Sequence, residues 1–262
     1  RRRRFLETLP ATYSLVVLAD KIPPAAAAPP ARAVRDFEAL APKNSKPART
    51  GYEPNMTLVE LETDLLIAGG GLSGVCAAVA AARHGARVVL LQDRSRLGGN
   101  SSSEVKMHVV GANSHKSRPG WREGGLIEEF RLDDAVNNPQ RCWELWDLLL
   151  YDKVVSEPNI TLLLETTLFS ARKKGDRIEH VMARCDKSEH LYRIRAKYFM
   201  DATGDARLAV ESGAEYRFGR EGQAEFGESL APEKPDAETQ GSSILFTSRL
   251  HQRPILMTIG RS

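Results

Sequence analysis

The segment that most constrains the fold is residues 63–93, TDLLIAGGGLSGVCAAVAAARHGARVVLLQD. Residues 65–68 form a short apolar run, which is typical of a buried parallel strand. A glycine-rich turn follows, and residues 74–83 are almost all small or apolar, as a helix packed closely on a sheet requires. Residues 88–91 supply a second apolar strand. The segment therefore predicts one strand, turn, helix and strand unit of the Rossmann type.

Three glycines in the turn stand at GxGxxG spacing directly after the first strand. Gly69 permits a tight turn, Gly71 lets a pyrophosphate approach the backbone, and Gly74 lets the following helix lie close to the sheet. This helix is expected to start near Leu72 and to point free N–H groups and the positive end of its dipole at the turn. The turn therefore predicts a site for the phosphates of a dinucleotide.

The second strand ends at Gln92 and Asp93, about 20 residues after the turn, where an acidic side chain normally accepts hydrogen bonds from an adenosine ribose. Gln92 occupies the expected position, and Asp93 follows one residue later. An amide can bond a hydroxyl, but it lacks the charge that repels a 2′-phosphate. The pattern leaves open which of the two side chains meets the ribose.

Composition excludes several classes of protein. The chain has 262 residues and is 42% hydrophobic, which is ordinary for a globular protein of one large domain or two modest ones. Residues 1–50 carry ten Lys and Arg against four Asp and Glu, so the rest is net negative, which argues against a nucleic-acid-binding body. The three cysteines are widely separated, which fits neither a disulfide framework, a zinc site nor a complete iron–sulfur ligand set. No apolar run reaches the roughly 20 residues of a membrane span.

Three regions are expected along the chain. Residues 1–58 form a leader or linker, residues 59–215 the dinucleotide-binding domain with a helical insertion at about 120–157, and residues 216–262 the truncated beginning of a substrate domain. The N-terminal RRRRFL resembles the RRxFL pattern of a twin-arginine signal, which predicts export to the periplasm. The alternative is a basic extension of a cytoplasmic protein. Because the chain starts with Arg and stops after a strand-like run, we interpret it as a fragment.

Two helices are expected in the insertion, at residues 124–135 and 141–155. In the second, Trp143 and Trp146 belong to an apolar stripe at helical spacing, and such a stripe predicts packing in the core rather than stacking on a cofactor. Residues 160–164 then form another apolar run. They predict a further buried strand of the same sheet.

The next stretches predict an antiparallel meander and a return to the sheet. Residues 168–172, 177–185 and 191–196 alternate as strands do, and a Gly-Asp turn separates the first two. Residues 198–205, YFMDATGD, run from an apolar strand into a small-residue turn, and a short helix follows. Asp205 stands at the start of this helix, where we expect it to cap the helix or to bond a hydroxyl of a ligand.

Taken together, the motifs GGGLSG, QDRSRLGGNSSSEV and DATGD resemble the FAD-binding domain of the FAD-dependent oxidoreductases of the heterodisulfide reductase A-like superfamily, with its glutathione reductase-type fold. The resemblance runs from about residue 63 to residue 246. It implies an α/β fold, in which a Rossmann-like FAD-binding domain has a parallel sheet, an antiparallel β-meander and a helical insertion. It further implies FAD as the cofactor, no metal, and hydride transfer from a small-molecule or sugar-like substrate.

The resemblance also assigns contacts with FAD. The glycine turn would meet the pyrophosphate, the end of the second strand and the meander would meet adenosine, the LGGN motif would meet the central part of FAD, and the ATGD turn would close over the cofactor. The residues assigned in this way are Gly69, Gly71, Leu72, Ser73, Gly74, Gln92, Asp93, Arg94, Gly98, Gly99, Asn100, Ser101, Leu168 (through its backbone), Thr203, Gly204 and Asp205. The iron–sulfur cysteines of some relatives are absent from this sequence.

One side chain is a candidate for catalysis. His108 follows the segment expected to wrap the flavin, and histidine titrates near neutrality, so it can act as a base or orient a substrate. The alternative is a purely structural histidine. Two other functions stay open: an NAD-binding dehydrogenase, in which LGGN and ATGD would have no role, and a flavin-binding fragment that transfers electrons to an unknown acceptor.

Overall fold

The computed structural model describes residues 56–109 and 121–241. Contacts along the chain divide it into residues 1–39 and residues 40–262, and every described residue belongs to the second unit. The predictions of a leader with an export signal, and of the last part of the substrate domain, therefore lie outside the described residues.

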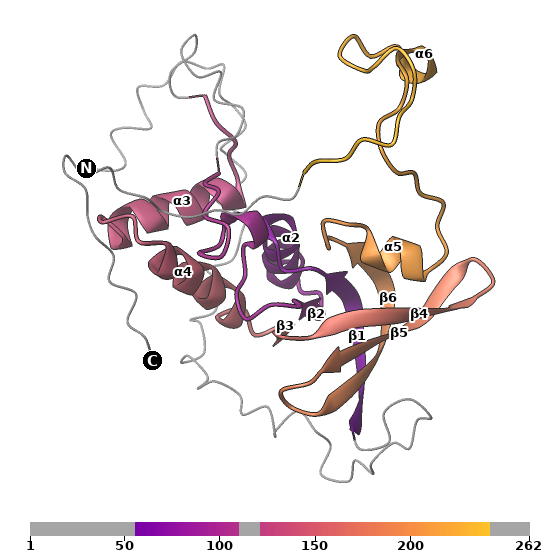
Figure 1. Ribbon diagram of the computed structural model, residues 1–262. Coiled ribbons are helices and arrows are strands. Elements are labelled where there is room, and N and C mark those ends of the chain that lie inside the picture. Colours follow the sequence, from indigo (N-terminus) through magenta and orange to yellow (C-terminus); the bar gives the residue numbers. More distant parts are fainter. Residues whose placement is uncertain (1–55, 110–120, 242–262) are drawn as a thin grey trace, which may run out of the picture. The chain divides into compact units, whose positions relative to one another are not determined.

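The fold is built on one six-stranded sheet with the strand order β3-β2-β1-β6-β5-β4 (Figure 1). Strands β3, β2, β1 and β6 are parallel neighbours, and β4, β5 and β6 form an antiparallel meander. The prediction of a Rossmann-like parallel sheet with a meander is confirmed. The strands are β1 (Thr57–Ala68), β2 (Val88–Leu91), β3 (Ile160–Leu163), β4 (Thr167–Lys174), β5 (Arg177–Cys185) and β6 (His190–Asp201).

Two strands are longer than the sequence predicted. β6 is one continuous strand where residues 191–196 and 198–205 were expected as two, because its first half pairs with β5 while its whole length pairs with β1. β1 begins at Thr57, inside the predicted linker, and ahead of the apolar run at residues 65–68. Its first half, TLVELET, alternates polar and apolar residues and buries Val59. The meander and the parallel sheet therefore share β6.

Three of the helices, α2, α3 and α4, pack together on one face of the parallel strands β1 and β2, and side chains of the meander pack against the opposite face of these two strands. The helices are α2 (Leu72–Arg83), α3 (Leu126–Asn137), α4 (Trp143–Val155), α5 (Arg207–Glu211) and α6 (Gln223–Phe226), with a short 3₁₀ turn η3 (Gly99–Ser101). The two expected helices of the insertion are confirmed as α3 and α4.

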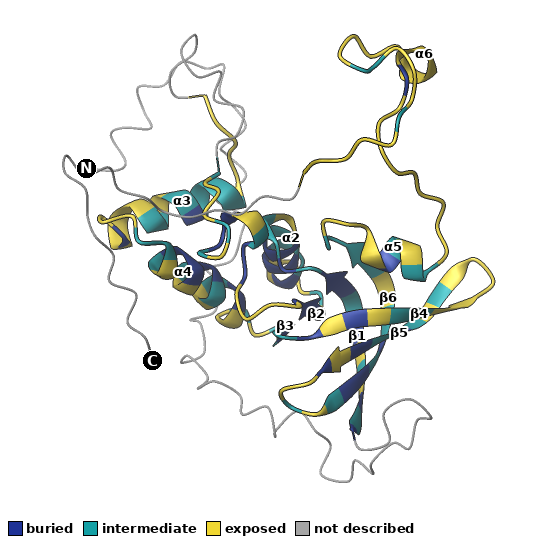
Figure 2. Cartoon of the chain, viewed as in Figure 1, coloured by how far each residue is buried: buried dark blue, intermediate teal, exposed yellow. Residues whose placement is uncertain are grey.

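Two apolar cores follow from this arrangement, because successive residues of a strand point to opposite faces. On one face Leu66 and Leu91 pack with Val181 and Ile194 of the meander. On the other face the residues from β1 and β2 pack with α2, α3 and α4, and they include Ile67, Leu90, Val75, Phe130 and Leu150. Figure 2 shows the buried residues along the strands and on the inner sides of these helices. Apolar runs in β1 and β2 are explained by burial on both faces.

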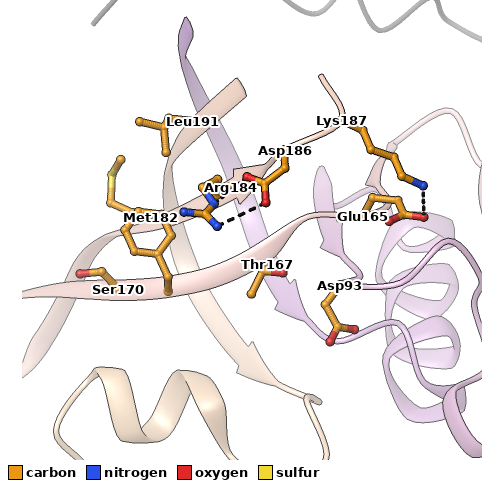
Figure 3. Close-up of a pocket in the computed structure, with 10 residues that line it drawn as sticks. Asp93, Glu165, Thr167, Ser170, Met182, Arg184, Asp186, Lys187 and Leu191 are labelled. Carbon is orange, nitrogen blue, oxygen red and sulfur yellow. Dashed lines mark hydrogen bonds and ion pairs between the residues drawn. The ribbon is translucent and has the colours of Figure 1, made fainter. Parts of the chain in front are cut away.

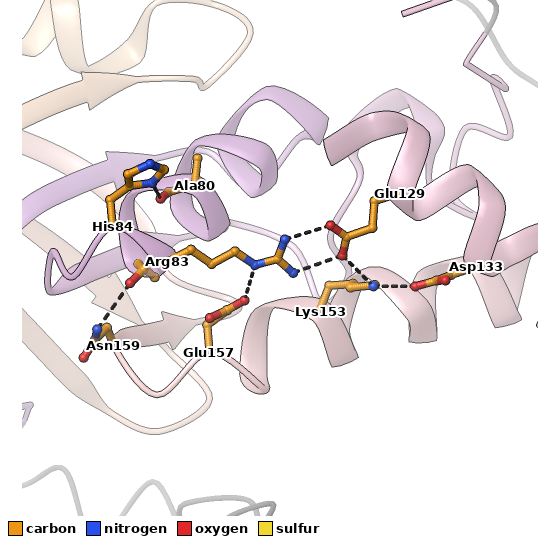
Figure 4. Close-up of polar contacts among 9 residues, drawn as sticks. Ala80, Arg83, His84, Glu129, Asp133, Lys153, Glu157 and Asn159 are labelled. Atoms are coloured by element: carbon orange, nitrogen blue, oxygen red, sulfur yellow. Dashed lines mark hydrogen bonds and ion pairs between the residues drawn. The ribbon is translucent and has the colours of Figure 1, made fainter. Parts of the chain in front are cut away.

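A cluster of charged side chains joins α2 to the insertion (Figure 4). Arg83 at the end of α2 donates two hydrogen bonds to Glu129 of α3, at 2.7 and 3.0 Å, and one to Glu157, at 2.7 Å. Lys153 of α4 donates to Glu129 at 2.8 Å and also pairs with Asp133. The hydrogen bond from Arg83 is the main cause that lowers the pKa of Glu129 to about 2. This cluster fixes α3 and α4 against the end of α2.

Candidate functional site

Three segments meet where the parallel strands end: the turn after β1, the segment after β2 and the turn after β6. The Gly98 N–H donates to the Gly70 carbonyl at 2.8 Å, and Gly98 forms an isolated parallel bridge with Gly71. The Ala202 N–H donates to the Ala68 carbonyl at 2.7 Å. The structure therefore brings the glycine turn, the LGGN motif and the ATGD turn together, at the carboxyl edge of the sheet where ligands bind in such folds.

Gly69 and Gly74 are required by close packing. Gly69 has φ +102°, and a Cβ at this position would lie 2.2 Å from the Ala202 carbonyl oxygen. A Cβ at Gly74 would lie 1.9 Å from the Gly69 carbonyl oxygen. Both distances are far below a van der Waals contact, so no larger residue fits without a backbone shift. The predicted mechanical purposes of these two glycines are confirmed.

Gly71 differs from them because it faces open space. Its φ of −63° suits any residue, and nothing lies within 4 Å of the position that a Cβ would take. Gly71 is the N-cap of α2, which has no side-chain cap, and the N–H groups of Ser73 and Gly74 donate no hydrogen bond within the described residues. Open space in front of free N–H groups and the positive end of a 12-residue helix fits a phosphate group.

Gln92 has a structural role that the sequence did not indicate. Its side chain is buried, its Oε1 accepts from the Gly70 N–H at 2.8 Å, and its Nε2 donates to the Arg96 carbonyl at 2.8 Å. Both ends of the amide are thus used inside the protein, and Gln92 ties the glycine turn to the segment after β2. The predicted ribose contact of Gln92 stays a prediction, and this geometry favours its neighbour Asp93 for that contact. Asp93, the next residue, is exposed.

A groove of about 930 Å³ begins at Asp93 and follows the meander (Figure 3). Its charged rim is largely neutralised, because Lys187 pairs with Glu165 at 2.8 Å and Arg184 pairs with Asp186 at 2.8 Å. Asp93 has no ion pair among the described residues. The groove is lined by Asp93, Glu165, Thr167, Phe169, Ser170, Met182, Arg184, Asp186, Lys187 and Leu191.

Leu168 lies in β4 between two residues that line this groove. Its side chain is buried in the core between the sheet and the meander. Because β4 is the edge strand of the sheet, one side of its backbone has no strand partner among the described residues. This position is compatible with the predicted contact through the backbone of Leu168.

The turn after β6 is organised by Asp201. Its Oδ1 accepts from the N–H and the hydroxyl of Thr203, at 3.0 and 2.7 Å, and its Oδ2 accepts from the Ala209 N–H at 2.8 Å. Burial by itself would raise the pKa of Asp201, but these hydrogen bonds outweigh it and hold the pKa below its usual range. Thr203 Oγ1 also accepts from the Arg207 N–H at 2.8 Å. Asp205 is exposed and makes no such bond, so its expected role as a helix cap is wrong.

His108 lies on the surface beside the LGGN motif. The Met107 N–H donates to the Asn100 carbonyl at 2.9 Å, which folds the segment back on the motif. Residues 104–109 contain no strand, and His108 is exposed, with no hydrogen bond to any other described residue. The alternative of a purely structural histidine has no hydrogen bond of this side chain to support it among the described residues.

Of the remaining predicted contacts, Arg94, Asn100 and Gly204 are exposed near the meeting point of the three segments, whereas Ser101 is buried. Trp146 is buried in the core as predicted, but its Nε1 also donates to Ser101 Oγ at 3.2 Å. Sequence reasoning missed the neighbouring residue Asp147, which accepts a hydrogen bond from the Ser103 N–H, two residues after Ser101. An acidic residue inside an otherwise apolar helical stripe is the signal that could have identified it.

Two absences hold for the part of the chain that the structure describes. It contains no group of three or more His, Cys, Asp or Glu side chains placed to hold a metal ion. In the same ranges, 56–109 and 121–241, no helix combines the length and the apolar character that crossing a bilayer demands.

Comparisons with known proteins identify a family of flavoenzymes. The family model described as FAD dependent oxidoreductase matches residues 64–254. A subunit of the opine oxidase of Agrobacterium tumefaciens (strain Ach5) is 32% identical over 94 residues, which are 36% of this chain and 18% of that protein. This chain therefore matches less than a fifth of that relative's length.

Solved structures similar to the chain include the flavin-dependent monooxygenase PieE in complex with FAD and substrate, with a TM-score of 0.41 and 18% identity over 61% of this chain and 33% of that chain. L-proline dehydrogenase from P. horikoshii has a TM-score of 0.36 and 20% identity over 56% of this chain and 23% of that chain. Because these TM-scores are low, the assignment of the chain to a family rests on the match to the family model and not on these structures.

Proposed function

Because this chain belongs to the FAD-dependent oxidoreductase family, we propose that it transfers a hydride between a small-molecule substrate and FAD held at the turn after β1. The observation that carries this proposal is the open space in front of Gly71, at the uncapped N-terminus of α2 and beside the LGGN and ATGD segments. When bound, FAD accepts the hydride, while the protein supplies orientation and electrostatics. FAD is the cofactor of the family, so the alternative of an NAD-binding dehydrogenase is set aside.

The phosphates would lie over Gly71, where the N–H groups of Ser73 and Gly74 are free to donate to them. The Asp93 carboxylate, rather than the Gln92 amide, would accept hydrogen bonds from the ribose, because the amide is already used inside the protein. The backbone of Leu168 would meet adenine at the edge of the groove. These assignments give each of the three converging segments a task.

His108 is proposed as the residue that takes or holds a proton of the substrate. It is exposed, it neighbours the LGGN motif, and no other described side chain engages it. Replacing it by Gln in the full-length protein should lower the rate of flavin reduction, with little change in flavin content, since His108 is not part of the cofactor site proposed above. An unchanged reduction rate would remove His108 from the mechanism.

We propose a sugar-like or other small polar substrate, and from the motifs GGGLSG, LGGN and DATGD alone we propose that the chain belongs among the heterodisulfide reductase A-like enzymes. The partial likeness to the opine oxidase makes opines a second class to examine. Export through the twin-arginine pathway is proposed from the N-terminal RRRRFL alone.

The test starts with the visible absorption spectrum of the purified full-length protein, followed by acid release and identification of the cofactor. Stoichiometric FAD is expected, and a colourless protein that binds NAD would overturn the proposal. Sugars and opines are then added without oxygen, and a substrate is recognised by bleaching of the flavin band. Bound FAD that no donor bleaches, but that a redox partner reduces, would favour the alternative of an electron-transfer protein.

A further inference from the structure

The segment of residues 96–103, which carries the LGGN motif, is held from two sides. On one side Gly98 is hydrogen bonded to the glycine turn, as described above. On the other side lies α4, where Trp146 Nε1 donates to Ser101 Oγ in the protein interior. Leu150, one helical turn further on, packs against Gly98, since a Cβ built on Gly98 would lie 2.9 Å from Leu150 Cδ1. The inserted helix thus forms the outer support of this segment.

Asp147 of α4 contacts both ends of the segment. Its Oδ1 accepts from the Ser103 N–H at 2.9 Å, and its Oδ2 lies 3.2 Å from Arg96 Nε. The second contact is an ion pair without hydrogen-bond alignment, because Oδ2 has no hydrogen-bond partner among the described residues. Asp147 is only 8% exposed. Because an unpaired buried charge costs free energy, a carboxylate buried to this degree is stable only while its partners Ser103 and Arg96 stay in place.

We propose that Asp147 is a positioning residue of the FAD site, which holds residues 96–103 against the glycine turn so that FAD meets a preformed wall. The proposal rests on the proposed function. A short chain of contacts links Asp147 to the FAD site. Asp147 binds Ser103 and Arg96. Between these two residues, Gly98 is hydrogen bonded to Gly70, which lies next to the open space at Gly71. If the segment is in place in only a fraction of the molecules, the apparent dissociation constant for FAD rises by the inverse of that fraction.

The two interactions of Asp147 can be separated by substitution. Asp147→Asn keeps an oxygen that accepts from Ser103 but loses the charge that pairs with Arg96, whereas Asp147→Ala loses both. Arg96→Ala keeps the bond of Asp147 to Ser103 and removes the ion pair with Asp147, together with the longer contact of Arg96 with Glu104 at 3.9 Å. Asp152→Asn is the matched control, because Asp152 is an exposed residue of the same helix whose carboxylate lies beside Ser156, the C-cap of α4.

The experiment uses full-length protein freed of flavin and titrated with FAD, with flavin fluorescence as the measure of binding. The dissociation constant is expected to rise about tenfold or more in Asp147→Ala, which loses both contacts of the carboxylate. It is expected to rise about threefold in Asp147→Asn and Arg96→Ala, which lose the ion pair but keep the hydrogen bond to Ser103. The control should be unchanged. Hydrogen exchange in the flavin-free protein should rise at the Ser103 amide in Asp147→Ala and stay near the wild-type rate in Asp147→Asn.

Two results would overturn the proposal. The first is an FAD dissociation constant within twofold of wild type in both Asp147 variants, although exchange at Ser103 has risen in Asp147→Ala. The second is an equal weakening in Asp152→Asn, which would show a general effect of charge on α4. A wild-type protein that binds no FAD would instead refute the proposed function, and the exchange at Ser103, measured without FAD, distinguishes the two failures.

Discussion

Gly71 is the N-cap of α2 and Gly74 lies in its first turn, three residues later, and the same substitution should have opposite effects at the two positions. At Gly71 an added methyl group meets nothing within 4 Å, and the backbone has an ordinary φ of −63°. At Gly74 the methyl group would lie 1.9 Å from the Gly69 carbonyl oxygen. Alanine at Gly71 should therefore spare the fold and harm the cofactor site, whereas alanine at Gly74 should harm the fold.

The magnitudes follow from these distances. For Gly74→Ala, overpacking costs about 1–3 kcal/mol, and the better helix propensity of Ala returns up to about 1 kcal/mol. The clash is with backbone rather than with a flexible side chain, so we expect the upper half of the range, a net loss of about 2 kcal/mol. For Gly71→Ala, the weaker N-cap and the smaller entropy of the unfolded chain oppose each other, so the net change is within about 0.5 kcal/mol.

Two assays on the full-length protein check this pair. Thermal unfolding without FAD should show Gly74→Ala melting about 4–8 °C below wild type, with Gly71→Ala within about 2 °C, at the 2–4 °C per kcal/mol usual for domains of this size. Titration with FAD should show Gly71→Ala binding at least about tenfold more weakly, because its methyl group fills the space of the phosphate. Tight FAD binding by Gly71→Ala would refute the placement of the phosphate, and wild-type stability of Gly74→Ala would refute the packing argument.

Other residues lead to further predictions. Asp93→Asn should weaken FAD binding about fivefold by replacing a charged acceptor, whereas Gln92→Ala should mainly lower stability, by about 1–3 kcal/mol, since it leaves Gly70 N–H and the Arg96 carbonyl unpaired; FAD titration and urea unfolding separate the two, and the reverse pattern would restore Gln92 as the ribose contact. Glu129→Gln should lower stability by about 1 kcal/mol near neutral pH, a value kept small because the Arg83 pair is partly exposed. The pKa of Glu129 is lowered to about 2 in the folded protein, so its contribution is complete above the ordinary glutamate pKa and is lost as pH falls toward 2; urea unfolding of both proteins across pH 2–7 should show the difference disappearing in acid, and a difference that does not change with pH would contradict this origin. Asp201→Asn should destabilise the turn after β6 above pH 4 and lose its effect at lower pH, since the pKa of Asp201 is also lowered; hydrogen exchange at Ala209 measures it, and equal protection at neutral pH would speak against the network.

The glycine turn shows how far local sequence reaches. GxGxxG after an apolar run predicted the strand, the start of α2 at Leu72 and the purpose of Gly69 and Gly74, and the structure confirms each of them. The contact of Gly69 with the Ala202 carbonyl joins distant segments, whereas the start of α2 and the packing of Gly74 on the Gly69 carbonyl depend on residues close in sequence, which a motif records directly. The same holds for the helices of the insertion, whose apolar stripes appear in the sequence.

The features that the sequence did not indicate depend on contacts between distant segments. Gln92 stands where a ribose contact is usual, but its burial and its bonds to Gly70 and Arg96 follow from how the segment after β2 folds back. The side chains of Asp201 and Thr203 accept hydrogen bonds from N–H groups of α5, whereas Asp205 is exposed and accepts none of them. No local pattern distinguishes such choices among neighbouring polar residues.

The class of this protein can be assigned without its structure: the spacing of small and apolar residues specifies a Rossmann-type turn and, with LGGN and ATGD, points to FAD. Folding in three dimensions was needed to show that β6 serves both the meander and the parallel sheet, and that α4 supports the LGGN segment through Trp146 and Asp147. The difference is one of range. Backbone conformation and periodicity act over a few residues, whereas a buried hydrogen bond between residues 44 or 45 positions apart forms only when packing has brought its two ends together.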